Sequence, residues 1–195
     1  MPLICWVEAN ADKRYEWGEA GAGYLPDNAA KLRQSVYTAL AYGVKGIQWF
    51  TTGLVFRAGG ELTESGLDVQ GINAEVNALG PTLLGLRSTG VWHTEPVPEG
   101  APGLPEGGRV VTASAGLVIG ELVDEATGAI CLLVVNRSIE ENATAVLTLG
   151  EVEAAVEGLD PEAGVWRTAG VPDAEQRARV QSALRPGAGV LLRLQ

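Results

Sequence analysis

The chain has 195 residues, of which 46% are apolar and 19% are charged. This composition is typical of a globular protein that buries a core, and it argues against global disorder. The formal net charge of −10 gives the surface a negative field that repels phosphate backbones and anionic lipid headgroups, so we expect neither nucleic acid nor membrane as a partner.

The N-terminal segment is a short apolar run. Residues 3–7 (LICWV) predict a buried strand over Pro2–Ala9. Because a chain that begins inside a strand is often a piece of a longer protein, we expect the same here. The sequence shows neither the basic-then-apolar pattern of a signal peptide nor a run of about 18 apolar residues that would cross a membrane, so the localisation stays open.

A polar loop over residues 10–26 follows this strand and contains three aromatic residues, Tyr15, Trp17 and Tyr24. Aromatic rings on a loop at the end of a strand suit sugar binding, because they stack on the apolar C–H faces of pyranose rings. The same rings are equally consistent with packing of the loop onto the protein, and both interpretations stay open.

The most informative stretch is residues 33–53, RQSVYTALAYGVKGIQWFTTG. Leu32, Val36 and Leu40 recur at helical spacing and predict a helix that begins near Asp27 or Asn28 and ends near Tyr42. Glycines at 43 and 46 break the helix, and residues 47–50 then predict a strand. This helix-to-strand unit is of the kind that builds parallel sheets.

The pattern continues with a glycine-rich loop over 54–66 and a second helix over Leu67–Leu79, followed by a further turn over Thr82–Leu86. Residues 1–87 are therefore predicted to form a strand–helix–strand–helix segment. Four prolines and four glycines within 96–108 then predict a linker over 88–108, which includes a short strand-like run, VWHT, at 91–94.

Residues 109–195 predict an antiparallel β-sandwich. Apolar or alternating runs of strand length are separated by turn signals, and the segment 117–135 has the pattern of a hairpin with a Gly-terminated turn. The predicted strands are Arg109–Ala113, Leu117–Val123, Ala129–Val135, Ala143–Leu149, Glu153–Val156, Val165–Thr168, Arg179–Leu184 and Gly189–Leu194.

Residues 33–53 resemble the closing helix–strand unit of the barrel in glycoside hydrolases of the β-galactosidase-like superfamily. The runs GELVDEATGAICLLVVNRS, LDPEAGVW and LRPGAGVLLRL resemble the β-sandwich that follows the barrel in many such enzymes. The resemblance implies an α/β plus all-β chain, in which a partial (β/α)8-barrel segment over 1–87 precedes a C-terminal antiparallel β-sandwich.

The same resemblance implies candidate site residues at the ends of the two parallel strands. Glu8 is at the position of the nucleophile of a retaining glycosidase, and Trp49 is at the position of an aromatic residue that floors the sugar subsite. Asn10, Tyr15 and Trp17 on the following loop complete the expected carbohydrate-binding rim. Hydrolysis also requires a second carboxyl group, and no residue of this chain is assigned to that role. A solvated or salt-bridged glutamate is the competing interpretation of Glu8.

Other chemistries are not supported by the sequence. His93 is the single histidine and there is no Cys-X-X-Cys pair, so we expect no metal site and no cofactor. His93 is expected to be structural. Cys5 and Cys131 both lie in apolar runs, where buried free thiols are more common than a disulfide.

Two functions remain. The first is the C-terminal portion of a glycoside hydrolase, which acts on a glycan but is inactive as an isolated chain. The second is a non-catalytic module that binds carbohydrate or protein. Because two strands do not close a barrel, we expect their edges and one apolar face to be covered by missing sequence, the sandwich or a second copy of the chain.

Overall fold

The computed structural model describes residues 3–8, 29–50, 55–160 and 164–195. Its N-terminal part has the expected order of elements: β1 (Ile4–Glu8), α1 (Ala29–Ala41), β2 (Gly46–Phe50) and α2 (Glu64–Leu83). The strands β1 and β2 pair in parallel over their full length, from Ile4 opposite Gly46 to Glu8 opposite Phe50. Within the described ranges they form an open two-stranded sheet, and no closed barrel is present.

The remainder of the described chain is antiparallel β-structure, as predicted. Its strands are β3 (Leu86–His93), β4 (Val110–Ala113), β5 (Leu117–Asp124), β6 (Ile130–Asn136), β7 (Ala143–Leu149), β8 (Val156–Asp160), β9 (Val165–Gly170), β10 (Ala178–Leu184) and β11 (Gly189–Leu194). They form a six-stranded sheet in the order β3-β5-β6-β11-β8-β9 and a three-stranded sheet in the order β10-β7-β4.

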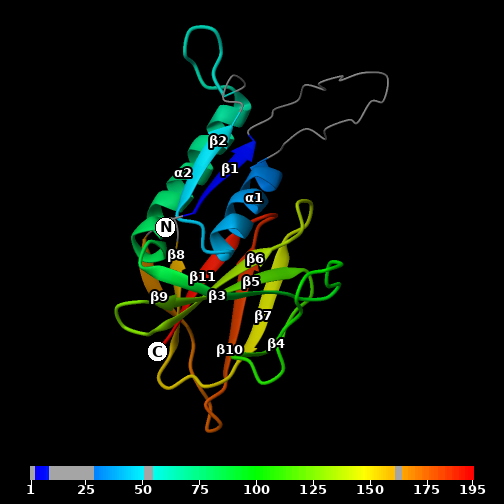
Figure 1. Cartoon of the computed structure of the whole chain (residues 1–195), viewed down its shortest axis with the longest axis vertical. Coiled ribbons are helices and arrows are strands. Elements are labelled where there is room, and N and C mark those ends of the chain that lie inside the picture. Colours follow the sequence, from blue (N-terminus) through cyan, green and yellow to red (C-terminus); the bar gives the residue numbers. More distant parts are fainter. Residues whose placement is uncertain (1–2, 9–28, 51–54, 161–163) are drawn as a thin grey trace.

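The elements are stacked in layers, with the two larger sheets at one end and the two-stranded sheet at the other (Figure 1). One apolar core lies between the three-stranded and six-stranded sheets and includes Leu132 and Val134 of β6. A second core lies on the opposite face of the six-stranded sheet, where Leu133 and Val135 of β6 pack against the helix layer. The middle sheet is thus covered on both faces, which explains why β6 is an almost continuous apolar run.

Helix α1 lies between β1 and the six-stranded sheet and contacts both. Its Leu32, Val36 and Leu40 are buried, and full burial of each such side chain contributes on the order of 1.5–3 kcal/mol. Helix α2 packs beside α1. It begins after Thr63, whose hydroxyl accepts a hydrogen bond from the amide of Gly66 at 3.0 Å and so caps the helix.

The close approach of α1 to the sheet depends on three glycines. A Cβ at Gly120 on β5 would be 2.8 Å from the Cα of Ala41, and a Cβ at Gly189 on β11 would be 2.6 Å from Cδ1 of Tyr37. Gly187, in the turn before β11, has a φ of +69° and would place a Cβ 2.7 Å from the backbone nitrogen of Gln34. We name Gly120, Gly187 and Gly189 the glycine seam, because they let a helix from the N-terminal part lie directly on the sandwich.

Several predicted boundaries are wrong. The expected linker over 88–108 begins inside β3, which pairs with β5, so only its proline-rich part lies between strands. Helix α2 is continuous through Pro81, where a break was expected, since buried Leu79 and Leu83 anchor both sides of that residue. The strand expected at 153–156 is shifted to Val156–Asp160. A division into domains near residue 87 stays a prediction.

Among the described residues, no helix is long and apolar enough to cross a membrane.

Candidate functional site

The carboxyl ends of β1 and β2 meet at one edge of the two-stranded sheet, as the sequence predicts for a parallel pair. The backbone of Glu8 is level with Phe50, one position beyond the pair formed by Val7 and Trp49. Both strands run away from the two larger sheets, so this edge lies at the far end of the molecule (Figure 1). The side chain of Glu8, together with Asn10, Tyr15 and Trp17, lies outside the described residues, and their assigned roles stay predictions.

Trp49 lies on the face of this sheet that the helices cover. Its ring is half-buried and packs against the core beneath α1 and α2. Its indole nitrogen donates a hydrogen bond to Oδ1 of Asn73 on α2 at 2.9 Å. The polar atom of the ring is therefore already engaged within the chain. A sugar-binding role for Trp49 stays a prediction.

The opposite face of the sheet carries two aromatic side chains that the sequence analysis did not single out. The rings of Trp6 and Phe50 stack with centroids 5.8 Å apart and an angle of 16° between their planes. Their side chains are 64% and 53% exposed, and Ile4, which shares the face of Trp6 on β1, is also exposed. We name these three residues the bare face. Large apolar side chains that are exposed next to one another often mark an interaction site, whereas scattered single ones do not.

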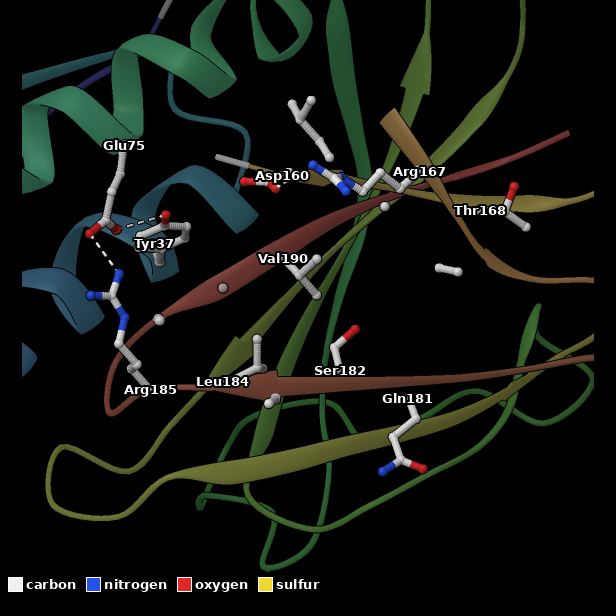
Figure 2. Close-up of a pocket in the computed structure, with 16 residues that line it drawn as sticks. Tyr37, Glu75, Asp160, Arg167, Thr168, Gln181, Ser182, Leu184, Arg185 and Val190 are labelled. Atoms are coloured by element: carbon white, nitrogen blue, oxygen red, sulfur yellow. Dashed lines mark hydrogen bonds and ion pairs between the residues drawn. The ribbon is translucent and has the colours of Figure 1, made fainter. Parts of the chain in front are cut away.

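A separate pocket of about 470 Å³ opens where the two sheets of the sandwich meet the helices. Figure 2 shows β10 along one side of this pocket and β11 along the other, with Ser182 and Leu184 of β10 pointing toward Val190 of β11. Arg167 and Thr168 of β9 lie at the far end. This volume is within the range of about 300–1,000 Å³ that small-molecule sites occupy.

Glu75 of α2 closes the helix end of the pocket through a set of polar contacts that we name the Glu75 cluster. Its carboxylate accepts hydrogen bonds from Nε of Arg33 at 3.3 Å, from the hydroxyl of Tyr37 at 3.0 Å and from Nη2 of Arg185 at 3.1 Å. Burial raises the pKa of Tyr37 far above its ordinary value, and the adjacent carboxylate raises it further. Tyr37 is therefore a neutral donor, and the cluster joins α1, α2 and the turn before β11.

Asp160 and Arg167 form an ion pair at the other end of the pocket, with 3.5 Å between Oδ2 and Nη2. Sequence reasoning missed this pocket altogether. Its lining comes from both helices and from β8 to β11, so no local motif could have indicated it.

His93 has the structural surroundings that the sequence predicts. It is buried, and its Nε2 lies 3.3 Å from the hydroxyl of Tyr42. Burial lowers the pKa of the imidazole, and the positive charge of Arg137 lowers it further. The structure records Nδ1 of His93 and Nη1 of Arg137 as buried atoms without a hydrogen-bond partner.

Neither a metal centre nor a disulfide is formed by the described part of the chain. No group of three or more His, Cys, Asp or Glu side chains there is placed to hold a metal ion. Cys5 and Cys131 are both free thiols. Burial raises the pKa of Cys131 to about 11, so this thiol is protonated at neutral pH and is a poor nucleophile.

Comparison with known proteins gives one kind of match. No protein-family model and no curated protein matches the sequence. Of the solved structures, 17 chains match, among them a gamma-CGTase from alkalophilic Bacillus clarkii. That structure aligns with 98% of this chain at 10% sequence identity and a TM-score of 0.45, and the chain spans 26% of its length.

Proposed function

We propose that this chain is the C-terminal portion of a glycoside hydrolase that acts on a glycan. The observation that carries the proposal is the arrangement of β1, α1, β2 and α2. Two parallel strands end at one edge, helices cover one face, and an apolar aromatic face is left bare on the other. In a (β/α)8 barrel the helices form the outer ring, and the opposite face of each strand lines the barrel interior.

The proposal assigns Glu8 as the nucleophile at the rim of that barrel. A retaining glycosidase needs a second carboxyl group about 5–5.5 Å away, which protonates the leaving oxygen while the nucleophile attacks the anomeric carbon. That second group would come from a strand that this chain does not supply. On this proposal, carbohydrate is the partner of the completed barrel, and the 195-residue chain alone has no hydrolytic activity.

The test compares three forms of the protein on a panel of aryl glycosides: the 195-residue chain, a form extended upstream in its reading frame, and the extended form with Glu8→Gln. We expect turnover only from the extended form, with loss of more than about 10³-fold on Glu8→Gln, because removal of a nucleophile leaves only binding and residual electrostatic effects. Glu99→Gln, on an exposed loop, is the matched control and should leave turnover unchanged.

Turnover by the 195-residue chain itself, or equal turnover by the extended form and its Glu8→Gln variant, would refute the proposal. A reading frame that does not continue upstream of this chain would also refute the proposal.

The exposed aromatic pair favours a second candidate, a non-catalytic module whose bare face pairs with a second copy of the chain. A stable dimer of the 195-residue chain that dissociates on Trp6→Ser would support this candidate. A monodisperse monomer by light scattering would exclude it.

A further inference from the structure

The two sheets of the sandwich leave one corner open, between β9 and β10. Among the described residues, β9 pairs only with β8, and β10 pairs only with β7, so each strand has a free edge. One isolated bridge, Pro172 opposite Ala178, joins the sheets at this corner. The pocket of about 470 Å³ is lined by 167–169 of β9 and 181–185 from the end of β10, so it lies along both free edges.

The backbone at the bridge shows which residues of β10 face the open corner. The carbonyl of Arg177 accepts a hydrogen bond from the amide of Asp173 at 2.8 Å. The carbonyl oxygen of Arg179 faces the same side, because a Cβ at Gly170 would lie 3.0 Å from it. In an antiparallel sheet, residues two positions apart direct their N–H and C=O groups to the same edge. The odd-numbered residues of β10 therefore direct these groups away from β7 and toward the corner.

Beyond the bridge this row continues with Gln181 and Ala183, which both line the pocket. Within the described residues, no backbone hydrogen bond joins their free edge to another segment. Their amide and carbonyl groups form a row of alternating donors and acceptors, with about 6.8 Å between equivalent groups. An extended peptide backbone matches such a row, and addition of a strand to a free edge is a general mode of peptide recognition.

The inner side of the sandwich has room for the side chains of an added strand. Ser182 and Leu184 of β10 point toward Val190 of β11 across the pocket (Figure 2). Gly158 of β8 lines the same pocket, and a Cβ there would have no neighbour closer than 3.6 Å. A strand on the edge of β10 would direct every second side chain to this inner side and the others to solvent. The inward positions suit side chains such as valine and threonine.

Arginines at the rim favour an acidic partner. The side chain of Arg167 is 68% exposed and contacts Asp160 through Nη2. The side chain of Arg185 is 57% exposed and contacts Glu75 through Nη2. A guanidinium group has five N–H donors, so carboxylates of a bound chain can add to both arginines without breaking either ion pair. At physiological salt, charges farther away than about 8 Å are largely screened, so these arginines outweigh the negative charge elsewhere on the chain.

We propose that the free edge of β10 binds an extended acidic segment of a partner protein, which pairs with Gln181 and Ala183 as a fourth strand of the three-stranded sheet. Its inward side chains enter the pocket, and its carboxylates lie on Arg167 and Arg185. This surface belongs to the sandwich, whereas Glu8 and the bare face lie at the far end of the molecule (Figure 1). The proposal is therefore independent of the proposed hydrolysis.

The test uses the 195-residue chain, labelled with ¹⁵N, and three synthetic peptides of about eight residues each. In the first peptide, valine and threonine alternate between terminal glutamates. The second has lysine in place of each glutamate, and the third has two prolines at its centre. We expect saturable amide shifts with the glutamate peptide, concentrated at residues 181–185 and 167–169. The other two peptides should bind at least roughly tenfold more weakly, because one carries the wrong charge and the other lacks backbone donors.

Two variants of the chain test the edge and the charge separately. Gln181→Pro removes an edge donor while the bonds to β7 stay, and it should weaken the binding roughly tenfold or more. Gln181→Ala keeps that donor and is its matched control. Arg167→Gln should weaken the binding roughly threefold or more, and it tests the proposal even if Gln181→Pro does not fold. Its control is Arg87→Gln on β3, because Arg87 is 60% exposed and is paired with Glu125 in a similar way.

Four results would overturn the proposal. The first is the absence of saturable shifts at 181–185 with the glutamate peptide. The second is equal binding by the lysine or the proline peptide. The third is a folded Gln181→Pro variant, or an Arg167→Gln variant, that binds as the parent chain does. The fourth is a shift of the same amides when the protein concentration alone is raised, which would assign the edge to a second copy of the chain. Failure of the hydrolysis assay on the extended form would leave this site unaffected.

Discussion

The strands β6 and β1 are both apolar, but they lie in opposite environments. In β6 six of seven residues are buried, because the three-stranded sheet covers one face and α1 covers the other. In β1 only one face is covered by α1, and Ile4 and Trp6 on the other face are 58% and 64% exposed. The apolar side chains of β6 are thus buried on both faces of their sheet, whereas those of β1 are buried on one face and exposed on the other.

This contrast shows which faces of the described sheets are covered. The six-stranded sheet has an apolar core on each of its two faces. The two-stranded sheet has a layer on one side only. We therefore expect its apolar bare face to be the surface through which the described molecule associates with other chains. If the contrast holds, substitutions in the covered layers will lower the free energy of unfolding, and substitutions in the bare face will lower self-association.

The largest effect is expected from Gly120→Ala in the glycine seam. The added methyl group would overlap the backbone of Ala41, so α1 must move off the sheet and its buried contacts loosen. We expect the free energy of unfolding to fall by about 3 kcal/mol in urea denaturation. Gly158→Ala on β8 is the control, since its nearest neighbour would be at 3.6 Å, and it should change stability by less than about 0.5 kcal/mol. Equal effects would show that the seam does not hold the helix.

A smaller loss is expected from Glu75→Gln, which tests the junction of the helices with the sandwich. The neutral amide cannot compensate Arg33, whose side chain is 13% exposed, and it weakens the bond from Tyr37. We expect a loss of about 2 kcal/mol by thermal or chemical denaturation. Glu125→Gln removes an ion pair with Arg87 in which both side chains are at least 60% exposed, and it should cost less than about 0.5 kcal/mol. A comparable loss in the two variants would contradict the role of the cluster.

The pH dependence of stability tests the burial of His93 in the covered part of the molecule. The pKa of His93 is lowered in the folded chain, so between that value and about 6.5 the unfolded chain binds the additional proton and stability falls as the pH is lowered. A single histidine adds at most about 1.4 kcal/mol per pH unit to this slope. His93→Gln should remove that part of the slope between pH 7 and pH 5. An unchanged pH dependence in the variant would show that His93 titrates as it does in the unfolded chain.

The smallest change in stability is expected from the bare face. A double variant, Trp6→Ser with Phe50→Ser, removes side chains that are already more than half exposed, so the free energy of unfolding should change by less than about 1 kcal/mol. Self-association measured by light scattering should nevertheless decrease. Leu67→Ser on α2 is also an exposed apolar change, at 57% exposure, and should leave association as it was. Equal effects of both variants on association would assign it to general hydrophobicity.

Periodicity predicted most elements of the described chain, although it assigned most of β3 to a linker, and it did not predict which layers lie above and below each element. The spacing of Leu32, Val36 and Leu40 correctly indicated α1 and its buried stripe, because a helix on a sheet needs only one apolar face. In β1 both alternating sets of side chains are apolar, so the pattern could not indicate which set faces the helices. Trp49 was named because the resemblance implies an aromatic residue near the end of the second strand, and the pattern gave no reason to single out Trp6.

The pocket and the glycine seam were invisible in the sequence for a related reason. Tyr37, Ser182 and Val190 meet in the pocket although up to about 150 positions separate them, and only the strand order brings them together. Gly120 and Gly189 have ordinary strand neighbours in the sequence. Glycine is required at these positions only because α1, which is distant along the chain, packs against them.

The glycine seam also constrains the order in which parts of the protein fold. Helix α1 leaves the ribosome long before Gly187 and Gly189, yet its final surface includes them. Contacts that join such distant positions form late and slow the folding of a domain. Helix α1 therefore cannot complete its packing until β11, the last strand of the described chain, has been synthesised.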